Sequence, residues 1–343
     1  MPFRFRSRLP QALVVLALLV SVRLWPAPLT REEELLGTTC TVTLYTGGSA
    51  AALDAAFARL AQIDARMTIT KTDSEVIEVN RAAGLHPVKV SADTYDVVRW
   101  GLQLSREGDG AFDITVAPLV QLWGIGSTRA RVPRPDEIKD ALGHIGYRDL
   151  QLSDKDSTVF LKRAGMGIDL GSIAKGYAAD DVARILKEHG VGAALINLGG
   201  NVLTMGTKPD GTEWRIGVQN PDQPRGTHIG IVSMKGGSVT TAGTYERFFE
   251  EGGKRYFHIL DARTGYPAWN GLAAVAIVSG DSTTSDGYDT LVFTLGLQKG
   301  RQFVEKLHGT IEAIFITDHH EVYVTPGLRA RFSLSDSSYT MIQ

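Results

Sequence analysis

The chain has 343 residues, 43% of them hydrophobic, which is enough to bury one large core or two modest ones. Its 36 basic and 38 acidic residues give a net charge of −2, and no basic block recurs beyond the N-terminus, so nucleic acid is not an expected partner. The single cysteine, Cys40, excludes an intramolecular disulfide framework and a cysteine-rich metal site.

The N-terminus has the layout of an export signal. Three arginines within residues 4–8 precede an apolar run at residues 12–22, and a Pro/Ala segment follows at residues 25–28. The run is short for a membrane-spanning helix, which needs roughly 20 residues. We therefore expect residues 1–30 to be either a cleaved export signal or an uncleaved membrane anchor.

Beyond residue 30 the pattern alternates between strands and helices. Apolar residues at helical spacing predict helices, and β-branched or alternating runs predict strands. The predicted helices cover residues 50–66, 74–80, 93–107, 133–140, a stretch from about 172, 285–296 and 298–306. The predicted strands cover residues 40–45, 193–197, 214–219, 229–233, 238–241, 256–260, 273–278, 311–317 and 321–324. Strict βαβ alternation is absent and no linker divides the chain, so we predict an α+β fold with largely antiparallel sheets and flanking helices, forming one unit over residues 31–343.

A glycine-rich helix start in residues 165–181 is the first candidate site. Two glycines bracket Asp169, and a helix is predicted to begin near Ser172, whose hydroxyl suits an N-cap. A helix start offers free amides and a positive dipole end, which favour anions such as phosphate, and Lys175 adds a full positive charge there. An ordinary capped helix accounts for the same residues, so both readings stay open.

The second candidate site lies in residues 281–290. If Ser285 caps a helix, Asp286 and Thr290 are four residues apart and share one face, and Asp289 lies beside them. Carboxylates and hydroxyls are hard oxygen donors, of the kind that bind Mg²⁺ together with substrate phosphates. Capping and surface residues of an ordinary helix would give the same pattern.

Two further stretches carry polar groups beside turns. In residues 256–267, His258 lies in an alternating strand, and a histidine can transfer protons near neutral pH. A single histidine in a strand is also common as a structural residue. In residues 108–115, an aromatic residue and a carboxylate follow a glycine turn, and Phe112 is expected in the core.

These stretches, with two others, resemble the ApbE family of FAD:protein FMN transferases. The resemblance runs from about residue 36 to at least residue 325. It rests on six motifs in order: GAFDITVAPLVQLWGIG (110–126), IDLGSIAKGYAAD (168–180), INLGGNV (196–202), TAGTYERFF (241–249), HILDARTGYP (258–267) and the D-x-x-x-T within residues 285–290. Six ordered motifs are far more specific than a lone glycine pattern.

The resemblance implies an enzyme that binds FAD and Mg²⁺ and cleaves the FAD diphosphate. Family members move the FMN moiety onto a threonine or serine hydroxyl of an acceptor protein as a phosphoester, and AMP is released. Most act outside the cytoplasmic membrane. We therefore expect an exported protein, in the periplasm or on the outer face of the inner membrane, whose acceptor belongs to an exported or membrane redox system.

Two alternatives remain open. One is an FAD pyrophosphatase, which gives FMN and AMP without a protein acceptor. The other is a periplasmic flavin-binding protein without turnover. Retention of His258, Asp286 and Thr290 together argues against pure binding, because storage needs no base beside a metal.

The resemblance also assigns residue roles. The metal ligands are expected to be Ser172, Asp286 and Thr290, with Asp289 as a further candidate. His258 is expected to be the general base that deprotonates the acceptor hydroxyl, because a hydroxyl is a weak nucleophile at neutral pH. The expected FAD contacts are Leu36, Ala111, Phe112, Asp113, Asp169, Lys175 and Leu260.

The sequence departs from the family at the D-x-x-x-T motif. The family commonly reads A-D-A-L-A-T, whereas this chain has Gly287 and Asp289 at two of the alanine positions. Asp289 adds a carboxylate to the expected metal site. Gly287 is expected to weaken the helix by up to about 1 kcal/mol relative to alanine.

Overall fold

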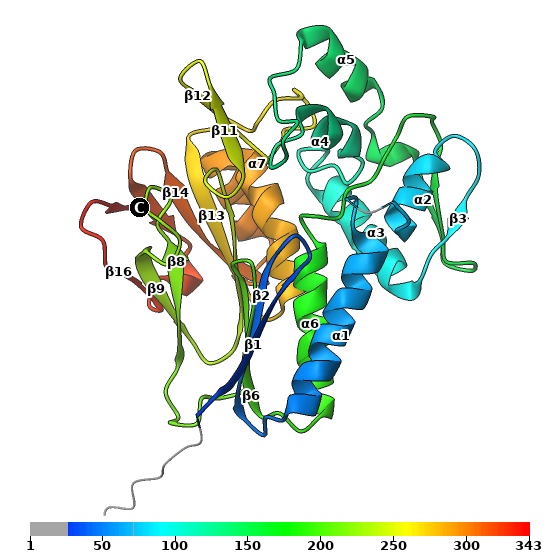
Figure 1. Cartoon of the computed structure of the whole chain (residues 1–343). Helices are drawn as coiled ribbons and strands as arrows, with labels where there is room; N and C mark the ends of the chain where they lie inside the picture. The colour runs from blue at the N-terminus through cyan, green and yellow to red at the C-terminus, as the bar shows by residue number, and fades with distance from the viewer. Residues whose placement is uncertain (1–26, 71) are drawn as a thin grey trace, which may run out of the picture.

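A nine-stranded sheet runs through the centre of the protein, of which the computed structural model describes residues 27–70 and 72–343 (Figure 1). Neighbouring strands are antiparallel except for the last pair. The order is β1 (Leu29–Leu35), β2 (Thr38–Thr46), β6 (Ala193–Leu198), β7 (Asn201–Met205), β10 (Gly237–Gly243), β13 (Leu272–Ser279), β14 (Ile311–Thr317), β15 (Glu321–Val324) and β17 (Thr340–Ile342). The predicted α+β fold with largely antiparallel sheets is confirmed.

The sheet is covered on both faces, as its central strand β13 shows. Val275 and Ile277 pack on one side and Ala274 and Ala276 on the other, and all four are fully buried. Burying such side chains stabilises a fold by about 1.5–3 kcal/mol for each valine or isoleucine. One face carries the helices α1 (Ala50–Met67), α6 (Ala174–Glu188) and α7 (Ser282–Lys306); the other carries the sheet of β16 (Phe332–Leu334), β9 (His228–Met234) and β8 (Trp214–Gln219) (Figure 1).

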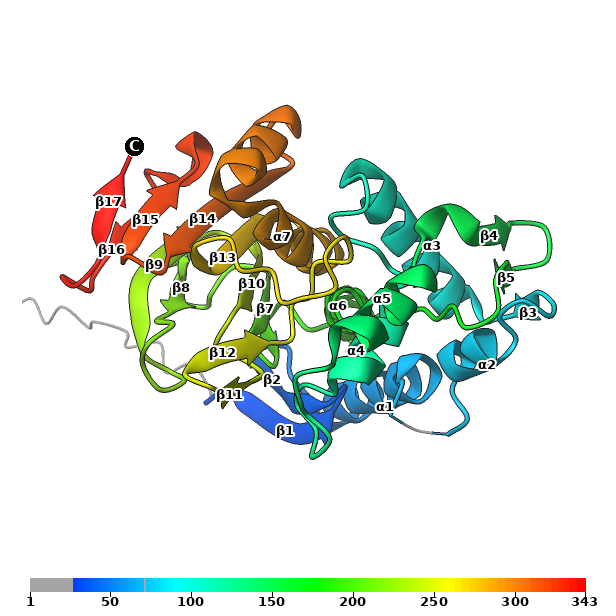
Figure 2. The ribbon, with the colours of Figure 1, turned by 90° about the horizontal axis from the view of Figure 1, so that it is seen from above.

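Most of the remaining elements lie on the side of α6 that faces away from the central sheet (Figure 2). The helices are α2 (Glu75–Arg81), α3 (Ala92–Glu107), α4 (Ala117–Trp123) and α5 (Pro135–Gly143), and a small sheet is formed by β3 (Val88–Lys89), β5 (Thr158–Leu161) and β4 (Leu150–Ser153). A separate hairpin is formed by β11 (Phe248–Glu251) and β12 (Lys254–Phe257). It stands at the top of the view in Figure 1, and its root reaches the candidate site.

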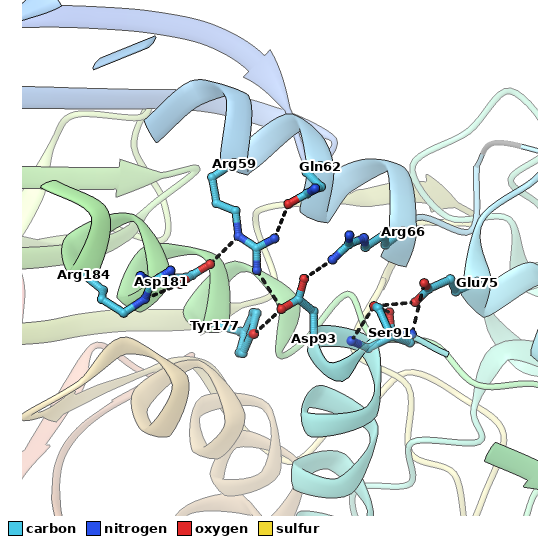
Figure 3. A network of polar contacts seen from close by, with 10 residues as sticks. Arg59, Gln62, Arg66, Glu75, Ser91, Asp93, Tyr177, Asp181 and Arg184 are labelled. Carbon is cyan, nitrogen blue, oxygen red and sulfur yellow. Dashed lines mark hydrogen bonds and ion pairs between the residues drawn. The ribbon is translucent and has the colours of Figure 1, made fainter. Parts of the chain in front are cut away.

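An ion-pair network fixes α6 against α1 and α3 (Figure 3). Arg59 of α1 bonds Asp181 of α6 and lies 2.7 Å from Asp93 of α3. The Tyr177 hydroxyl of α6 donates to the same Asp93 at 2.8 Å. Burial alone would raise the pKa of Asp93, but hydrogen bonds from Arg59 and Tyr177 and the charge of Arg66 hold it below its ordinary value. The network thus favours an ionised Asp93 and a fixed α6.

The predicted export signal or anchor lies almost entirely in residues 1–26, outside the described residues. In the part of the chain that the structure describes, no helix has the length and apolar character needed to cross a membrane. β1 begins at Leu29 and pairs with β2, so the predicted boundary at residue 30 falls inside a strand.

Candidate functional site

A cavity of about 420 Å³ opens between the start of α6, the first turns of α7, β10 and the root of the β11–β12 hairpin. Residues far apart in the sequence meet in its wall. All twelve residues predicted for FAD, metal or proton transfer line it: Leu36, Ala111, Phe112, Asp113, Asp169, Ser172, Lys175, His258, Leu260, Asp286, Asp289 and Thr290. The cavity places these residues together, while their individual roles stay predictions.

The start of α6 differs from the prediction in its capping. α6 begins at Ala174, and Ile173 occupies the N-cap position without a side-chain capping bond, so the prediction of Ser172 as the N-cap is wrong. The reason is local, because the amides of Ile173 and Ala174 both donate to the Leu170 carbonyl, at 3.0 and 2.9 Å. Ser172 lies on the cavity wall and is not used as a cap.

Lys175 and Gly176 connect the start of α6 to Asp286 of α7. The Gly176 amide donates to one Asp286 oxygen at 2.7 Å, and the Lys175 ammonium lies 3.4 Å from the other. Lys175 also donates to the Gly171 carbonyl at 2.9 Å. A side chain at Gly176 would place its Cβ 2.3 Å from the Ser282 carbonyl oxygen, so only glycine allows this approach of the two helices. Since the Gly176 amide is already bonded to Asp286, the Lys175 ammonium, and not this amide, offers positive charge to a ligand at the start of α6.

The start of α7 lies earlier than predicted. Asp281 is the N-cap and accepts from the Thr284 amide at 2.8 Å, so the prediction of Ser285 as the cap is wrong. Ser285 is instead fully buried in the first turn, where its hydroxyl donates to Ser238 at 2.9 Å. The earlier start leaves Asp286 in the helix with Thr290 four residues on, so both still share a face.

Asp180 of α6 supplies the other partners for the start of α7. Its carboxylate accepts from the amides of Ser282 and Thr283, at 2.8 and 2.7 Å, and from the Thr283 hydroxyl at 2.5 Å. These contacts satisfy backbone donors that a helix start leaves free. α6 therefore sets the position of the first turns of α7.

Two carboxylates of α7 are buried beside each other in the cavity wall. Asp286 and Asp289 are 2% and 4% exposed. Burial, and then the negative charge of Asp286, raise the pKa of Asp289 well above its ordinary value, although Lys175 and a 3.0 Å hydrogen bond from Thr290 act in the opposite direction. A bound cation would relieve this repulsion.

The donor set at the two carboxylates fits a hard cation such as Mg²⁺ rather than a metal that is held by several histidines or cysteines. Within residues 27–70 and 72–343, no group of three or more His, Cys, Asp or Glu side chains is placed to hold a metal ion. A magnesium site here would instead combine Asp286 and Asp289 with the hydroxyls of Thr290 and Ser172, which line the same cavity. Mg²⁺ accepts such a set, because it keeps several waters and binds substrate phosphates.

The sequence predicts a strand over residues 256–260, which would include His258. The observed strand β12 ends at Phe257, so His258 is the first residue after it. Its amide donates to the Arg247 carbonyl at 3.0 Å, which fixes the residue at the root of the hairpin. Its Nδ1 atom is enclosed and has no hydrogen-bond partner among the described residues. Burial, and then the positive charges of Arg247 and Lys175, lower the pKa of His258 to about 4. The imidazole is therefore neutral at pH 7 and can accept a proton.

Asp113 and Asp169 differ in what their oxygens are free to do. Asp113 accepts from the hydroxyl and amide of Thr115 with one oxygen, at 2.7 and 2.8 Å, and from the Tyr147 amide with the other, at 2.9 Å. It thereby fixes its own loop. Asp169 accepts from the Gly171 amide with one oxygen, at 2.7 Å, and burial raises its pKa. Asp169 thus has the more available carboxylate.

Sequence reasoning assigned no role to three polar residues of the cavity wall. Arg247 donates to the Gly37 carbonyl at 3.0 Å, and Arg225 pairs with Glu246. The Asn201 side-chain amide is buried and has no hydrogen-bond partner among the described residues. Arg247 lies in the motif at residues 241–249 and Asn201 in the motif at residues 196–202. These two motifs could therefore have pointed to both residues as candidates for the site. Their place in one cavity wall with Lys175 and His258 arises only from the fold.

Gly287 also differs from its sequence-based expectation. A Cβ at this position would lie 2.6 Å from Nε1 of Trp100 and 2.8 Å from a methyl of Leu104, both on α3. Glycine thus permits close packing of α7 on α3. Alanine at this position would favour the helix more than glycine does, but its methyl group would be too close to Trp100 and Leu104.

The comparisons with known proteins agree with one another. The model of the ApbE family matches residues 36–315. An FAD:protein FMN transferase of Klebsiella pneumoniae is 39% identical over 308 residues, which covers 90% of this chain and 95% of the relative. An FAD:protein FMN transferase of Treponema pallidum is 34% identical over 328 residues, covering 91% and 90%.

Solved structures show the same relationship. The ApbE protein of Thermotoga maritima superposes with a TM-score of 0.82 at 30% identity, covering 89% of this chain and 99% of that one. The apo form of the flavinyl transferase ApbE of Pseudomonas stutzeri gives a TM-score of 0.78 at 30% identity, covering 90% and 98%. With a family match over most of its length and relatives of this identity and coverage, the chain belongs to the ApbE family.

Proposed function

We propose that this protein is an FAD:protein FMN transferase that requires Mg²⁺, uses a threonine or serine hydroxyl of an acceptor protein, and releases AMP. The relatives' names support the transfer itself. The observation that carries the finer proposal is the cavity wall, where Lys175, two buried carboxylates of α7 and a neutral His258 face one space.

The residues of the cavity fit each requirement of the transfer. Lys175, Arg225 and Arg247 offer positive charge to a diphosphate. The acceptor hydroxyl oxygen attacks the phosphorus of the FMN half, the bond from this phosphorus to the bridging oxygen breaks, and AMP leaves with that oxygen. The hydroxyl proton passes to the imidazole of His258, which is neutral and lines the cavity. Bound at Asp286, Asp289 and Thr290, Mg²⁺ would neutralise charge on the diphosphate oxygens.

The cellular setting is also part of the proposal. The arginine-rich N-terminus followed by a short apolar run supports export to the periplasm or to the outer face of the inner membrane. If the protein is attached to the inner membrane, residues 1–30 are the segment that attaches it. The acceptor is then a protein of an exported or membrane redox system.

The experiment that tests this function measures AMP release and flavin transfer in one reaction. The purified protein is incubated with FAD and Mg²⁺, with and without a candidate acceptor protein, and the products are separated by chromatography and by a denaturing gel. We expect AMP and a flavin-fluorescent acceptor band, both lost when EDTA is added. AMP and free FMN without a labelled band would indicate the pyrophosphatase, and FAD binding without AMP would indicate the non-catalytic flavin-binding protein.

A further inference from the structure

The β11–β12 hairpin is rooted in the wall of the cavity at both ends. β11 begins immediately after Glu246 and Arg247, and β12 ends immediately before His258, and these three residues line the cavity. Anything that lies along the hairpin therefore leads directly to the proposed base. In Figure 1 the hairpin stands away from the central sheet.

The register of the hairpin shows which backbone groups point outward. Gly252 and Gly253 have φ of 60° and 74°, as in a two-residue type I′ turn. In such a hairpin the pair that closes the turn, Glu251 and Lys254, is hydrogen-bonded. Going away from the turn, successive pairs are alternately non-hydrogen-bonded and hydrogen-bonded. The bond from the His258 amide to the Arg247 carbonyl fits this alternation. The amide and carbonyl groups of Phe248 and Glu250 therefore point away from β12.

The two edges of the hairpin are not equivalent. On the outer edge of β12, the Trp269 indole donates to the Arg255 carbonyl at 3.1 Å, so this edge is covered. On β11, no strand other than β12 pairs with it, and no backbone hydrogen bond joins residues 248–251 to another segment of the described chain. An open edge of this kind is a template for an added strand.

The side chains around this edge have the composition of a binding surface. Phe248, on β11 itself, is 41% exposed. The guanidinium of Arg255 lies 4.3 Å from the centre of its ring. Exposed aromatic rings beside arginine are typical of the residues that contribute most to protein interfaces.

An aromatic stack makes the hairpin a firm platform. Tyr256 stacks on Phe249 at 5.1 Å and contacts Trp123 of α4 at 5.6 Å. Trp123 is fully buried and donates to the Gly265 carbonyl at 2.8 Å. An isolated two-stranded hairpin is marginal in water, so these contacts hold it in place for a partner.

We propose that the acceptor protein docks by pairing an extended segment with the open edge of β11, which brings its hydroxyl residue to the cavity at the Arg247 end. This inference rests on the proposed function and names the surface that recognises the acceptor. Because a strand advances about 3.3 Å per residue, pairing along residues 248–250 leaves the hydroxyl within a few residues of His258.

The test removes one outward backbone donor. Glu250→Pro deletes the outward amide of β11 without removing a hairpin hydrogen bond, and Glu250→Ala is the matched control with the same loss of charge. Initial rates of transfer are measured against the concentration of a candidate acceptor protein of an exported or membrane redox system. We expect Glu250→Pro to raise KM for the acceptor at least tenfold, with kcat and the Kd for FAD within twofold of wild type, while Glu250→Ala stays within threefold.

A second variant tests the aromatic part of the surface. It also keeps the proposal testable if Glu250→Pro does not fold. Phe248→Ser is compared with Leu85→Ser, which alters an apolar side chain that is 74% exposed on another part of the chain. We expect KM for the acceptor to rise at least fivefold in Phe248→Ser only. Acceptor KM values within twofold of wild type in both Phe248→Ser and any folded Glu250→Pro would overturn the docking proposal. Wild-type protein that binds FAD but never labels the acceptor would instead overturn the proposed function.

Discussion

His258 shows how a residue's surroundings, rather than its type, set its chemistry. Its ordinary pKa would leave it partly protonated near neutral pH. Burial and the nearby charges of Arg247 and Lys175 lower the pKa to about 4, so the free protein holds it neutral. A neutral imidazole is the form that a general base requires.

This environment predicts the pH dependence of the reaction. The value of kcat/KM for FAD reports the free protein, so its acid limb should lie near pH 4 to 5 and not near 6.5. In the pH profile of kcat the acid limb should lie at higher pH. The bound diphosphate offsets the positive charges of Arg247 and Lys175 and so raises the pKa of His258. Rates measured from pH 4 to 9, with His258→Ala as the variant that should lose this limb, provide the test. An acid limb of kcat/KM that is unchanged in His258→Ala would contradict the assignment.

Gly287 is a second position at which a single side chain matters. Alanine there would gain up to about 1 kcal/mol of helix propensity but would press on Trp100 and Leu104. Overpacking a filled site costs about 1–3 kcal/mol, so we expect Gly287→Ala to be less stable by about 1 kcal/mol in urea denaturation.

The matched control for this variant is a helical glycine with open space. Nothing lies within 4 Å of a Cβ built on Gly143, so Gly143→Ala should be neutral or slightly stabilising. A gain in stability for Gly287→Ala equal to that of Gly143→Ala would show that α3 does not constrain the position.

At the scale of elements, α6 and α7 form one functional pair. Lys175 and Gly176 contact Asp286, and four residues later Asp180 binds the first amides of α7. The carboxylates that face the cavity therefore depend on contacts made by another helix. Rigid support of this kind is what a precise site requires.

Removing Asp180 should expose this dependence. Asp180→Ala leaves the amides of Ser282 and Thr283 without their partner at a buried helix start, which costs about 1–3 kcal/mol. Thermal unfolding should show a lower Tm. Glu188→Ala, on the same helix but 61% exposed, should change stability by less than about 0.5 kcal/mol. Equal effects of the two substitutions would mean that Asp180 does not hold α7.

The elements that the sequence predicted correctly are those with strong periodicity. Residues 214–219 form β8 as predicted, and the break between residues 296 and 298 is Gly296, whose φ of 75° interrupts α7. The starts of α6 and α7 were less predictable. Ser172 and Ser285 have capping chemistry, but the Leu170 carbonyl accepts from the first amides of α6 and Asp281 caps α7. Local patterns cannot reveal such competition.

At the scale of the whole molecule, the site is a product of topology. Leu36, Asp169, His258 and Asp286 belong to four separate segments, which the central sheet and its helices bring to one cavity. The motifs identified most of these residues in advance. Arg225 and Arg247 received no role because their place in the cavity wall depends on the loop after β8 and on the hairpin root, which no local pattern specifies.

The central claim is that a diphosphate and a divalent cation meet between Lys175 and the carboxylates of α7. The most direct test is a crystal structure with FAD and Mn²⁺ in place of Mg²⁺, using anomalous scattering to locate the metal. The account predicts a metal peak about 2.1–2.2 Å from oxygens of Asp286 and Thr290, with the FAD diphosphate beside it and Lys175 in contact. A diphosphate bound away from Lys175, or a metal remote from both Asp286 and Asp289, would contradict the account.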